Sequence, residues 1–331
     1  MTRALAIVAL PIAALAACAD APAPEPYAWD LPRGFQPPRV PADNPMSADK
    51  VELGRALFFD PQLSGNGTQS CASCHEPDRA FTDGRARAVG STGALGRRSS
   101  MSLVNVAYSA SLTWADPTVV DLEAQALVPM FGAFPVELGL TEDLLVARMR
   151  GHYADDFARA FPDDAEPVTV TNVTRAIASY ERTLIAASSR FDTRQLAPAE
   201  QRGLALFESP RLGCTSCHGG PTFSVATGDR IQMFDTALYD PYPATDRGLA
   251  DITDLAADIG RFKPPTLRNI ALTAPYMHDG SIATLSDVID HYASGGRAPT
   301  SRNRSALLTG FTLSPDEKAD LLAFLGALTD Q

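Results

Sequence analysis

The chain has 331 residues, 45% hydrophobic and 20% charged, as expected for a globular protein of about two domains. Its formal net charge of −11 argues against nucleic acid or an anionic membrane surface as a binding partner. A basic electron donor or a neutral protein surface is compatible with this charge.

The first 17 residues predict an export signal. A short basic start precedes an apolar run over residues 4–17, which is shorter than the ~20 residues that a membrane-spanning helix needs. Residues 15–18 (LAAC) are typical of a bacterial lipoprotein signal, in which Cys18 is lipidated and becomes the mature N-terminus. An ordinary signal peptide cut nearby is the alternative. Because Ala19 follows Cys18, we expect a periplasmic protein whose only membrane contact is a lipid anchor in the outer membrane.

A proline-rich segment covers residues 18–45. Such segments are usually extended and bury little surface of their own. We therefore expect a tether that separates the globular part from the membrane.

One pentapeptide pattern occurs twice, as CASCH at residues 71–75 and CTSCH at residues 214–218. C-x-x-C-H is the attachment signature of a c-type haem, in which the cysteines bind the haem covalently and the histidine binds the iron. A zinc site built from both pairs would not require a histidine after each pair, and duplicated C-x-x-C pairs seldom form disulfides. The sequence thus predicts two covalent haems, with attachment and proximal iron-binding residues Cys71, Cys74, His75, Cys214, Cys217 and His218.

Each haem motif follows a similar helical pattern. GRALFFDPQL at residues 54–63 precedes the first motif, and GLALFESPRL at residues 203–212 precedes the second. Each pattern predicts a short amphipathic helix that ends before a proline. The repeat predicts a mainly α fold of two tandem cytochrome c-like domains with long loops, over residues 46–190 and 191–331, with one covalent haem c in each.

Three further helices have clear signals. The first has an apolar face formed by Val173, Ile177, Tyr180 and Leu184. The second starts after Thr141, which precedes acidic residues suited to a first turn. The third is the last helix, whose capped start is formed by Ser314, Pro315 and Glu317. Residues 80–100 and 224–263 predict long loops. Loops of this length in a compact domain are usually functional or bound to a cofactor.

Several motifs resemble the bacterial di-haem cytochrome c peroxidase and MauG family. They are LFFDPQLS at residues 57–64, the first haem motif, PPTLRNIALTAPY at residues 264–276 and HDG at residues 278–280, in the family order. The resemblance implies that the first haem reacts with hydrogen peroxide. It places Glu137 as the base that moves a proton between the peroxide oxygens, and Gln125 as a residue that orients peroxide or water. It places Trp114 between the haems as an electron relay.

The resemblance also implies a Ca²⁺ ion between the two haems. The family binds it with carbonyl groups at the positions of Thr273 and Pro275 and with an asparagine where this chain has Ser99. A hard cation can still use carbonyl groups and water molecules.

Two departures from the peroxidase pattern indicate a MauG-like enzyme. The peroxidases of this family carry a histidine in the loop after the first haem motif, which binds the first iron and leaves it upon reduction. No histidine occurs in residues 76–151 of this chain, so the comparison implies a five-coordinate first haem that needs no reductive activation. Tyr292 stands where the peroxidases have a methionine that binds the second iron, and MauG also has a tyrosine there. A tyrosine oxygen favours high-valent iron, which would let the second haem store an oxidising equivalent. His291 is the alternative ligand, and His278 is expected near the second haem rather than on its iron.

Residues 27–32 (YAWDLP), 65–75 and 81–90 resemble the MbnH branch of the MauG-like enzymes, whose members convert a tryptophan of an MbnP-type partner to kynurenine. We therefore expect an exported oxidoreductase that uses hydrogen peroxide, through a high-valent iron state, to oxidise a partner protein. One alternative is a peroxidase that takes electrons from a small cytochrome c or cupredoxin. The other is a non-enzymatic electron carrier with two six-coordinate haems.

Overall fold

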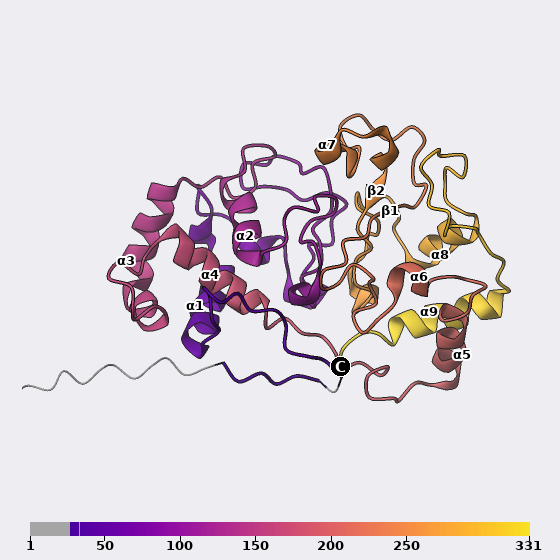
Figure 1. The fold of residues 1–331 in the computed structure, drawn as a ribbon, viewed down its shortest axis with the longest axis horizontal. Helices are drawn as coiled ribbons and strands as arrows, with labels where there is room; N and C mark the ends of the chain where they lie inside the picture. Colours follow the sequence, from indigo (N-terminus) through magenta and orange to yellow (C-terminus); the bar gives the residue numbers. More distant parts are fainter. Residues whose placement is uncertain (1–26, 33) are drawn as a thin grey trace, which may run out of the picture.

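The computed structural model describes residues 27–32 and 34–331, which form a mainly helical molecule of two lobes (Figure 1). The predicted signal peptide, Cys18 and the first part of the proline-rich segment lie outside the described residues. No helix of the described part combines the length and the apolar character that a bilayer span requires.

The lobes differ in their elements. The first contains α1 (Ala48–Phe59), α2 (Leu122–Phe131), α3 (Glu142–Ala160) and α4 (Val170–Glu181). The second contains α5 (Pro198–Phe207), α6 (Thr215–His218), α7 (Ala250–Thr253), α8 (Leu285–Ala293), α9 (Pro315–Gly326) and the antiparallel strands β1 (Phe234–Asp235) and β2 (Arg261–Phe262). Short 3-10 helices are η1 (Pro61–Leu63), η2 (Cys71–Ser73), η3 (Pro77–Arg79), η4 (Val106–Tyr108), η5 (Ala256–Asp258) and η6 (Ile270–Leu272).

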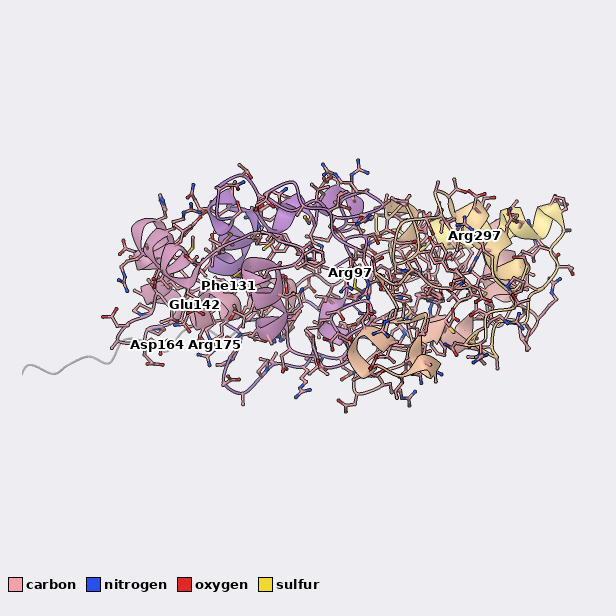
Figure 2. The ribbon with its side chains drawn as sticks, turned by 90° about the horizontal axis from the view of Figure 1, so that it is seen from above. Arg97, Phe131, Glu142, Asp164, Arg175 and Arg297 are labelled. Carbon is pink, nitrogen blue, oxygen red and sulfur yellow. The ribbon has the colours of Figure 1, made fainter. Side chains whose placement is uncertain are left out.

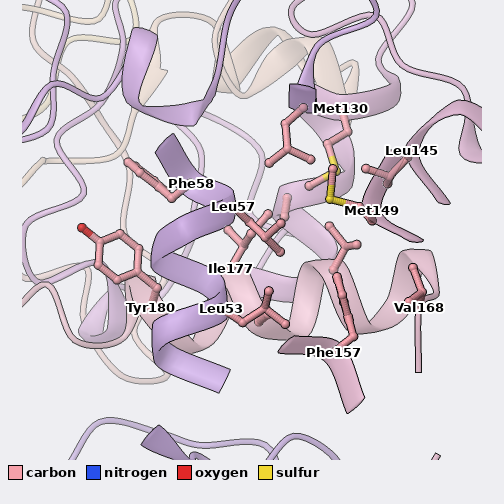
Figure 3. Packing of buried hydrophobic residues seen from close by; sticks show 14 of the residues in the cluster. Leu53, Leu57, Phe58, Met130, Leu145, Met149, Phe157, Val168, Ile177 and Tyr180 are labelled. Carbon is pink, nitrogen blue, oxygen red and sulfur yellow. The ribbon is translucent and has the colours of Figure 1, made fainter. Parts of the chain in front are cut away.

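The first core forms where α1 packs on α4, with α2 and α3 contributing further side chains (Figure 3). Val173, Ile177 and Tyr180 of α4 are buried in it, which confirms the expected apolar face. Leu184 packs against the same core but lies beyond the end of the helix. A second core lies between α5 and α9 and contains Phe207, Phe223, Phe324, Leu321 and Leu328. Apart from Ala115, the buried residues of the second core come after residue 190 and those of the first core before it; the domain boundary near residue 190 stays a prediction.

The repeated helix has the same packing in both lobes. A Cβ atom on Gly54 of α1 would lie 1.9 Å from the carbonyl oxygen of Ala176, and one on Gly203 of α5 would lie 2.0 Å from that of Asp320. Only glycine allows the backbones to approach so closely. Both helices end before the proline of the repeat, at Phe59 and Phe207, as the sequence predicts.

The predicted helix starts are confirmed. The hydroxyl of Thr141 accepts a hydrogen bond from the backbone N–H of Leu144 at the start of α3. At the start of α9, the N–H of Glu317 donates to Ser314 Oγ, and the N–H of Ser314 donates to Glu317 Oε2. This reciprocal pair is a capping box.

The proline-rich segment packs more closely than expected. From residue 34 to residue 45 it lies against both lobes: the Arg268 guanidinium lies 5.2 Å from the centre of the Phe35 ring, and Tyr108 donates a hydrogen bond to the carbonyl of Gln36. Asn44 is buried and donates to Glu123 Oε1 at 2.7 Å. Residues 34–45 therefore form no helix or strand and no core of their own, but they pack on the two lobes. Composition alone predicted extension, but not the ring and amide contacts that fix this segment.

The two long loops meet where the lobes join. Residues 80–100 contain no α-helix or strand, whereas residues 224–263 contain β1, α7, η5 and β2. Arg98 of the first loop forms an ion pair with Asp246 of the second at 2.7 Å, and Arg97 pairs with Asp251 at 3.2 Å. Figure 2 shows Arg97 near the middle of the molecule, between the labelled residues of the first lobe and Arg297 of the second.

Candidate functional site

The two motif histidines have equivalent hydrogen bonds. His75 Nδ1 lies 2.9 Å from the carbonyl oxygen of Phe81, and His218 Nδ1 lies 3.1 Å from that of Phe223. Because a carbonyl oxygen only accepts, Nδ1 carries the hydrogen and Nε2 keeps its lone pair for a metal ion. Burial lowers the pKa of both histidines, which favours the neutral, metal-binding form.

The two pairs of motif cysteines lie against different cores. Cys71 packs against the first core and Cys214 against the second, and the four described cysteines form no disulfides. Burial raises the pKa of Cys74, Cys214 and Cys217 to about 11. The described residues contain no cluster of three or more His, Cys, Asp or Glu side chains suited to a metal ion. This geometry does not fit one zinc site shared by both pairs.

A cavity of about 220 Å³ lies beside the second motif. Cys214, Cys217 and His218 line it, together with Tyr292 and largely apolar side chains such as Phe207 and Leu325. An apolar cavity that presents two thiols and an imidazole nitrogen fits a covalently attached haem.

Tyr292 and His291 have different surroundings. Burial raises the pKa of Tyr292, and Cys217 and Cys214 raise it further, so this phenol lies close to the second motif. His291 is buried outside the lining of the cavity, and its Nε2 lies 2.9 Å from the carbonyl oxygen of Thr236. Of the two candidate ligands, Tyr292 is the one that shares the cavity with His218.

His278 lies at the wall of the same cavity, as the resemblance predicts. Its ring stacks on Phe262 with a centroid distance of 3.7 Å and an interplanar angle of 13°. Burial lowers its pKa to about 4, so the imidazole is neutral at physiological pH. The stacking fixes the ring beside the cavity.

Trp114 separates this cavity from a smaller one. The indole lines the 220 Å³ cavity and also a cavity of about 60 Å³, whose wall includes Ser99, Thr273 and Pro275. Trp114 Nε1 donates a hydrogen bond to the carbonyl oxygen of Ser99 at 2.9 Å. The three residues expected to bind calcium therefore share one small cavity next to the indole.

On the side of the first motif, Glu137 lies half-buried in the loop after α2, and its carbonyl accepts a hydrogen bond from the N–H of Ser91 at 2.7 Å. Burial raises the pKa of its carboxyl group. The pKa of Cys74 is raised mainly by burial, and then by the charges of Asp83 and Glu137. Glu137 therefore lies near the first motif. Gln125 is half-buried on α2, and its side chain makes no hydrogen bond to the described residues.

Sequence reasoning missed Lys263, which is only 5% exposed. Its Nζ donates to Ser109 Oγ at 2.9 Å and to the carbonyl of Ser111, and its backbone N–H donates to the carbonyl of Trp114. Burial lowers its pKa to about 7. No carboxylate of the described residues pairs with it. The neighbouring prolines at positions 264 and 265 gave no signal of this burial.

Comparison with known proteins identifies the class of this fold and site. Residues 48–199 match the family model described as di-haem cytochrome c peroxidase. Cytochrome-c peroxidase IdrP1 of Denitromonas iodatirespirans is 36% identical, covering 98% of this chain and 92% of the relative. Methylamine utilization protein MauG of Methylorubrum extorquens is 36% identical, covering 87% and 80% respectively. The chain belongs to the di-haem cytochrome c peroxidase and MauG family.

One solved structure is similar over nearly its whole length. A MauG-like protein associated with microbial copper homeostasis superposes with a TM-score of 0.90 at 45% identity, covering 92% of this chain and 96% of that protein. The family implies two haem groups and a peroxidase-type oxidoreductase that uses hydrogen peroxide.

Proposed function

We propose that this protein is an exported MbnH-like enzyme that uses hydrogen peroxide to oxidise a tryptophan of an MbnP-type partner protein to kynurenine. The observation that carries this proposal is the position of Tyr292, which shares the second cavity with His218 while His291 bonds to Thr236. A tyrosine oxygen suits an iron that stores oxidising power better than a thioether does. The similarity to a MauG-like protein associated with copper homeostasis supports the same branch.

The haems would be held covalently by the four motif cysteines, with His75 on the first iron and His218 and Tyr292 on the second. When bound, they would supply the reduction of peroxide and the storage of two oxidising equivalents. Glu137 would take a proton from one peroxide oxygen and return it to the leaving oxygen, which is the task of a general acid–base residue. Its half-buried position near the first motif supports this role. Gln125 would orient peroxide or water.

Trp114 would carry electrons between the two sites, because its indole lines both the cavity of the second motif and the small cavity beside it. Ser99, Thr273 and Pro275 would bind Ca²⁺ there with carbonyl and hydroxyl oxygens, which are the ligand types that calcium prefers. The enzyme would act in the periplasm, anchored to the outer membrane by lipidated Cys18.

A second function is a peroxidase that consumes hydrogen peroxide with electrons from a small cytochrome c or cupredoxin. Relatives named cytochrome-c peroxidase favour it. The lack of a histidine in residues 76–151 and the tyrosine at position 292 count against it.

The deciding experiment incubates the holoenzyme with hydrogen peroxide and a purified MbnP-type partner, and measures the partner's tryptophans by peptide mass spectrometry. Kynurenine that forms only with enzyme and peroxide supports the proposal. Rapid turnover with reduced cytochrome c and no change in the partner contradicts it in favour of the peroxidase. Electron paramagnetic resonance of the ferric enzyme distinguishes these two enzymatic functions from a non-enzymatic electron carrier. The carrier would lack the high-spin signal of a five-coordinate haem.

A further inference from the structure

A row of aromatic rings leads outward from the second cavity. His278 and Phe262 line the cavity and stack on each other at 3.7 Å. The ring of Tyr242 lies 6.2 Å from that of Phe262 and 6.4 Å from that of His278 between centroids. The ring of Tyr239 lies 5.6 Å from that of Tyr242. Tyr242 is buried and Tyr239 is half-buried, so the row ends at the protein surface.

Each tyrosine of this row donates its phenolic hydrogen to a carboxylate. Tyr242 Oη donates to Asp235 Oδ1 at 2.9 Å, and Tyr239 Oη donates to Asp279 Oδ2 at 2.5 Å. Burial raises the pKa of both phenols, and these aspartates raise it further, so both phenols keep their hydrogen at neutral pH. The carboxylates are therefore positioned as proton acceptors.

This pairing matters because a tyrosine that loses an electron also loses its phenolic proton. A carboxylate at hydrogen-bond distance can take that proton and give it back. Other tyrosines near the cavity lack such a partner: Tyr276 donates to the carbonyl oxygen of Ile270, which cannot take up a proton. Tyr153 does pair with a carboxylate, that of Asp60, but it packs against the first core and not the second cavity.

We propose that Tyr242 and Tyr239 form the path by which oxidising equivalents leave the second cavity and reach an aromatic residue of a docked partner protein at the surface. This inference rests on the proposed function, which supplies hydrogen peroxide as the oxidant. In each cycle one electron moves from Tyr242 to the group that the second cavity would hold once hydrogen peroxide has oxidised it, and the phenolic proton of Tyr242 moves to Asp235. One electron then moves from Tyr239 to Tyr242, the proton of Asp235 returns, and the proton of Tyr239 moves to Asp279. An electron from the partner then reduces Tyr239, and the proton held by Asp279 returns to its phenolic oxygen.

The test mixes the holoenzyme with hydrogen peroxide in the absence of any partner and freezes it for electron paramagnetic resonance. We expect a tyrosine radical in the wild type, identified by the narrowing of its signal when tyrosine is supplied with deuterated rings. Tyr242→Phe should abolish the radical, whereas Tyr239→Phe should leave a radical on Tyr242. Tyr153→Phe is the matched control, since it removes an equivalent tyrosine–aspartate hydrogen bond in the other lobe.

The phenylalanine variants should keep the fold. Asp235 retains hydrogen bonds from the N–H of Ala237 and the hydroxyl of Ser301 after the phenol is removed, and the ring at position 242 still packs. The haem absorption of Tyr242→Phe should still respond to peroxide, but the oxidised state should decay more slowly because its outlet is removed.

The double variant carries both Tyr242→Phe and Tyr239→Phe. A tyrosine radical that survives in it overturns the path but not the proposed function. So does a wild type whose haem absorption responds to peroxide but which forms no tyrosine radical. A wild type whose haem absorption does not respond to peroxide contradicts the proposed function together with the path. Kynurenine formation in an MbnP-type partner that is equally fast with the wild type and the double variant also overturns the path, while leaving the proposed function intact.

Discussion

Trp114 Nε1 donates a hydrogen bond to the carbonyl oxygen of Ser99 at 2.9 Å, and this contact joins the wall of one cavity to the wall of the other. A second contact fixes the same residue, because the backbone N–H of Lys263 donates to the carbonyl of Trp114 at 2.8 Å. An indole whose N–H is bonded and whose backbone is fixed keeps a defined orientation. That orientation is what an electron relay between two haem sites would require.

Trp114→Phe should therefore separate the two sites electronically with little effect on the fold. The carbonyl of Ser99 loses its donor, at a cost of about 1 kcal/mol of unfolding free energy. We expect the first haem still to react with peroxide and the response of the second haem to slow, as followed by stopped-flow absorption. Trp29→Phe is the control, because Trp29 contacts Tyr27 and lines neither cavity. Equal rates in both variants would exclude the relay.

Glu137→Gln should slow the reaction with peroxide by about 10²–10⁴-fold, the usual contribution of a general acid–base residue. The wild-type rate should also depend on pH, since only the carboxylate can accept a proton. Burial raises the pKa of Glu137, so the rate should fall as the pH drops through a value above that of an ordinary glutamate. The variant should lack this fall.

The control for this variant is Glu142→Gln, which changes an exposed carboxylate in the first turn of α3. Its rate and pH profile should match those of the wild type. A Glu137→Gln enzyme that keeps the wild-type rate would show that another group moves the proton.

Tyr292→Phe should change the absorption and magnetic spectra of the second haem while leaving those of the first unchanged. His291→Asn should leave both spectra intact, because His291 is engaged by the carbonyl of Thr236 outside the cavity lining. The opposite result, with the second haem altered by the His291 variant only, would assign the ligand to His291.

Local signals in the sequence predicted much of the fold. The capping residues of α3 and α9 and the glycine-containing repeat in α1 and α5 each act over a few neighbouring positions, so they can be recognised without knowledge of the partner segment. Strands β1 and β2 have two residues each, too few for any periodic pattern.

The parts of the candidate site that depend on contacts between distant segments could not be predicted. The row of Tyr239, Tyr242, Phe262 and His278 joins three segments. The burial of Lys263 depends on Ser109 and Ser111, more than 150 positions away in the sequence. No spacing in the chain relates these positions, because the fold alone brings them together.

Gly203→Ala should destabilise the protein strongly, since the added Cβ would lie 2.0 Å from the carbonyl oxygen of Asp320 and α5 would have to move away from α9. Overpacking of this kind costs about 1–3 kcal/mol and sometimes more. Gly151→Ala in α3 is the opposite control, because no atom lies within 4 Å of its Cβ position. It should stabilise the helix by up to ~1 kcal/mol. Thermal unfolding measures both, and a Gly203 variant as stable as the wild type would contradict the close crossing of α5 and α9.

Glu181→Gln should stabilise the protein at neutral and alkaline pH. The side chain of Glu181 is 5% exposed, its Oε2 atom has no hydrogen-bond partner, and the neighbouring Arg182 donates both Nη atoms to Glu123 instead. Burial raises the pKa of Glu181 to about 8. Between the pKa of an exposed glutamate and this value, the folded protein binds the proton that the unfolded chain has lost, so stability falls as the pH rises.

Glutamine is neutral at every pH and removes this loss, so the unfolding free energies of variant and wild type should agree near pH 4 and diverge towards pH 8, by on the order of 4 kcal/mol. Glu200→Gln is the matched control, because Glu200 is equally buried but bonds to Arg190 and to the N–H of Ala197. It should not stabilise the protein towards pH 8, since the substitution removes a charge that both of these partners stabilise. A Glu181 variant whose stability follows the wild type across this range would show that a hydrogen-bond donor or a cation keeps the carboxyl group ionised in the folded protein.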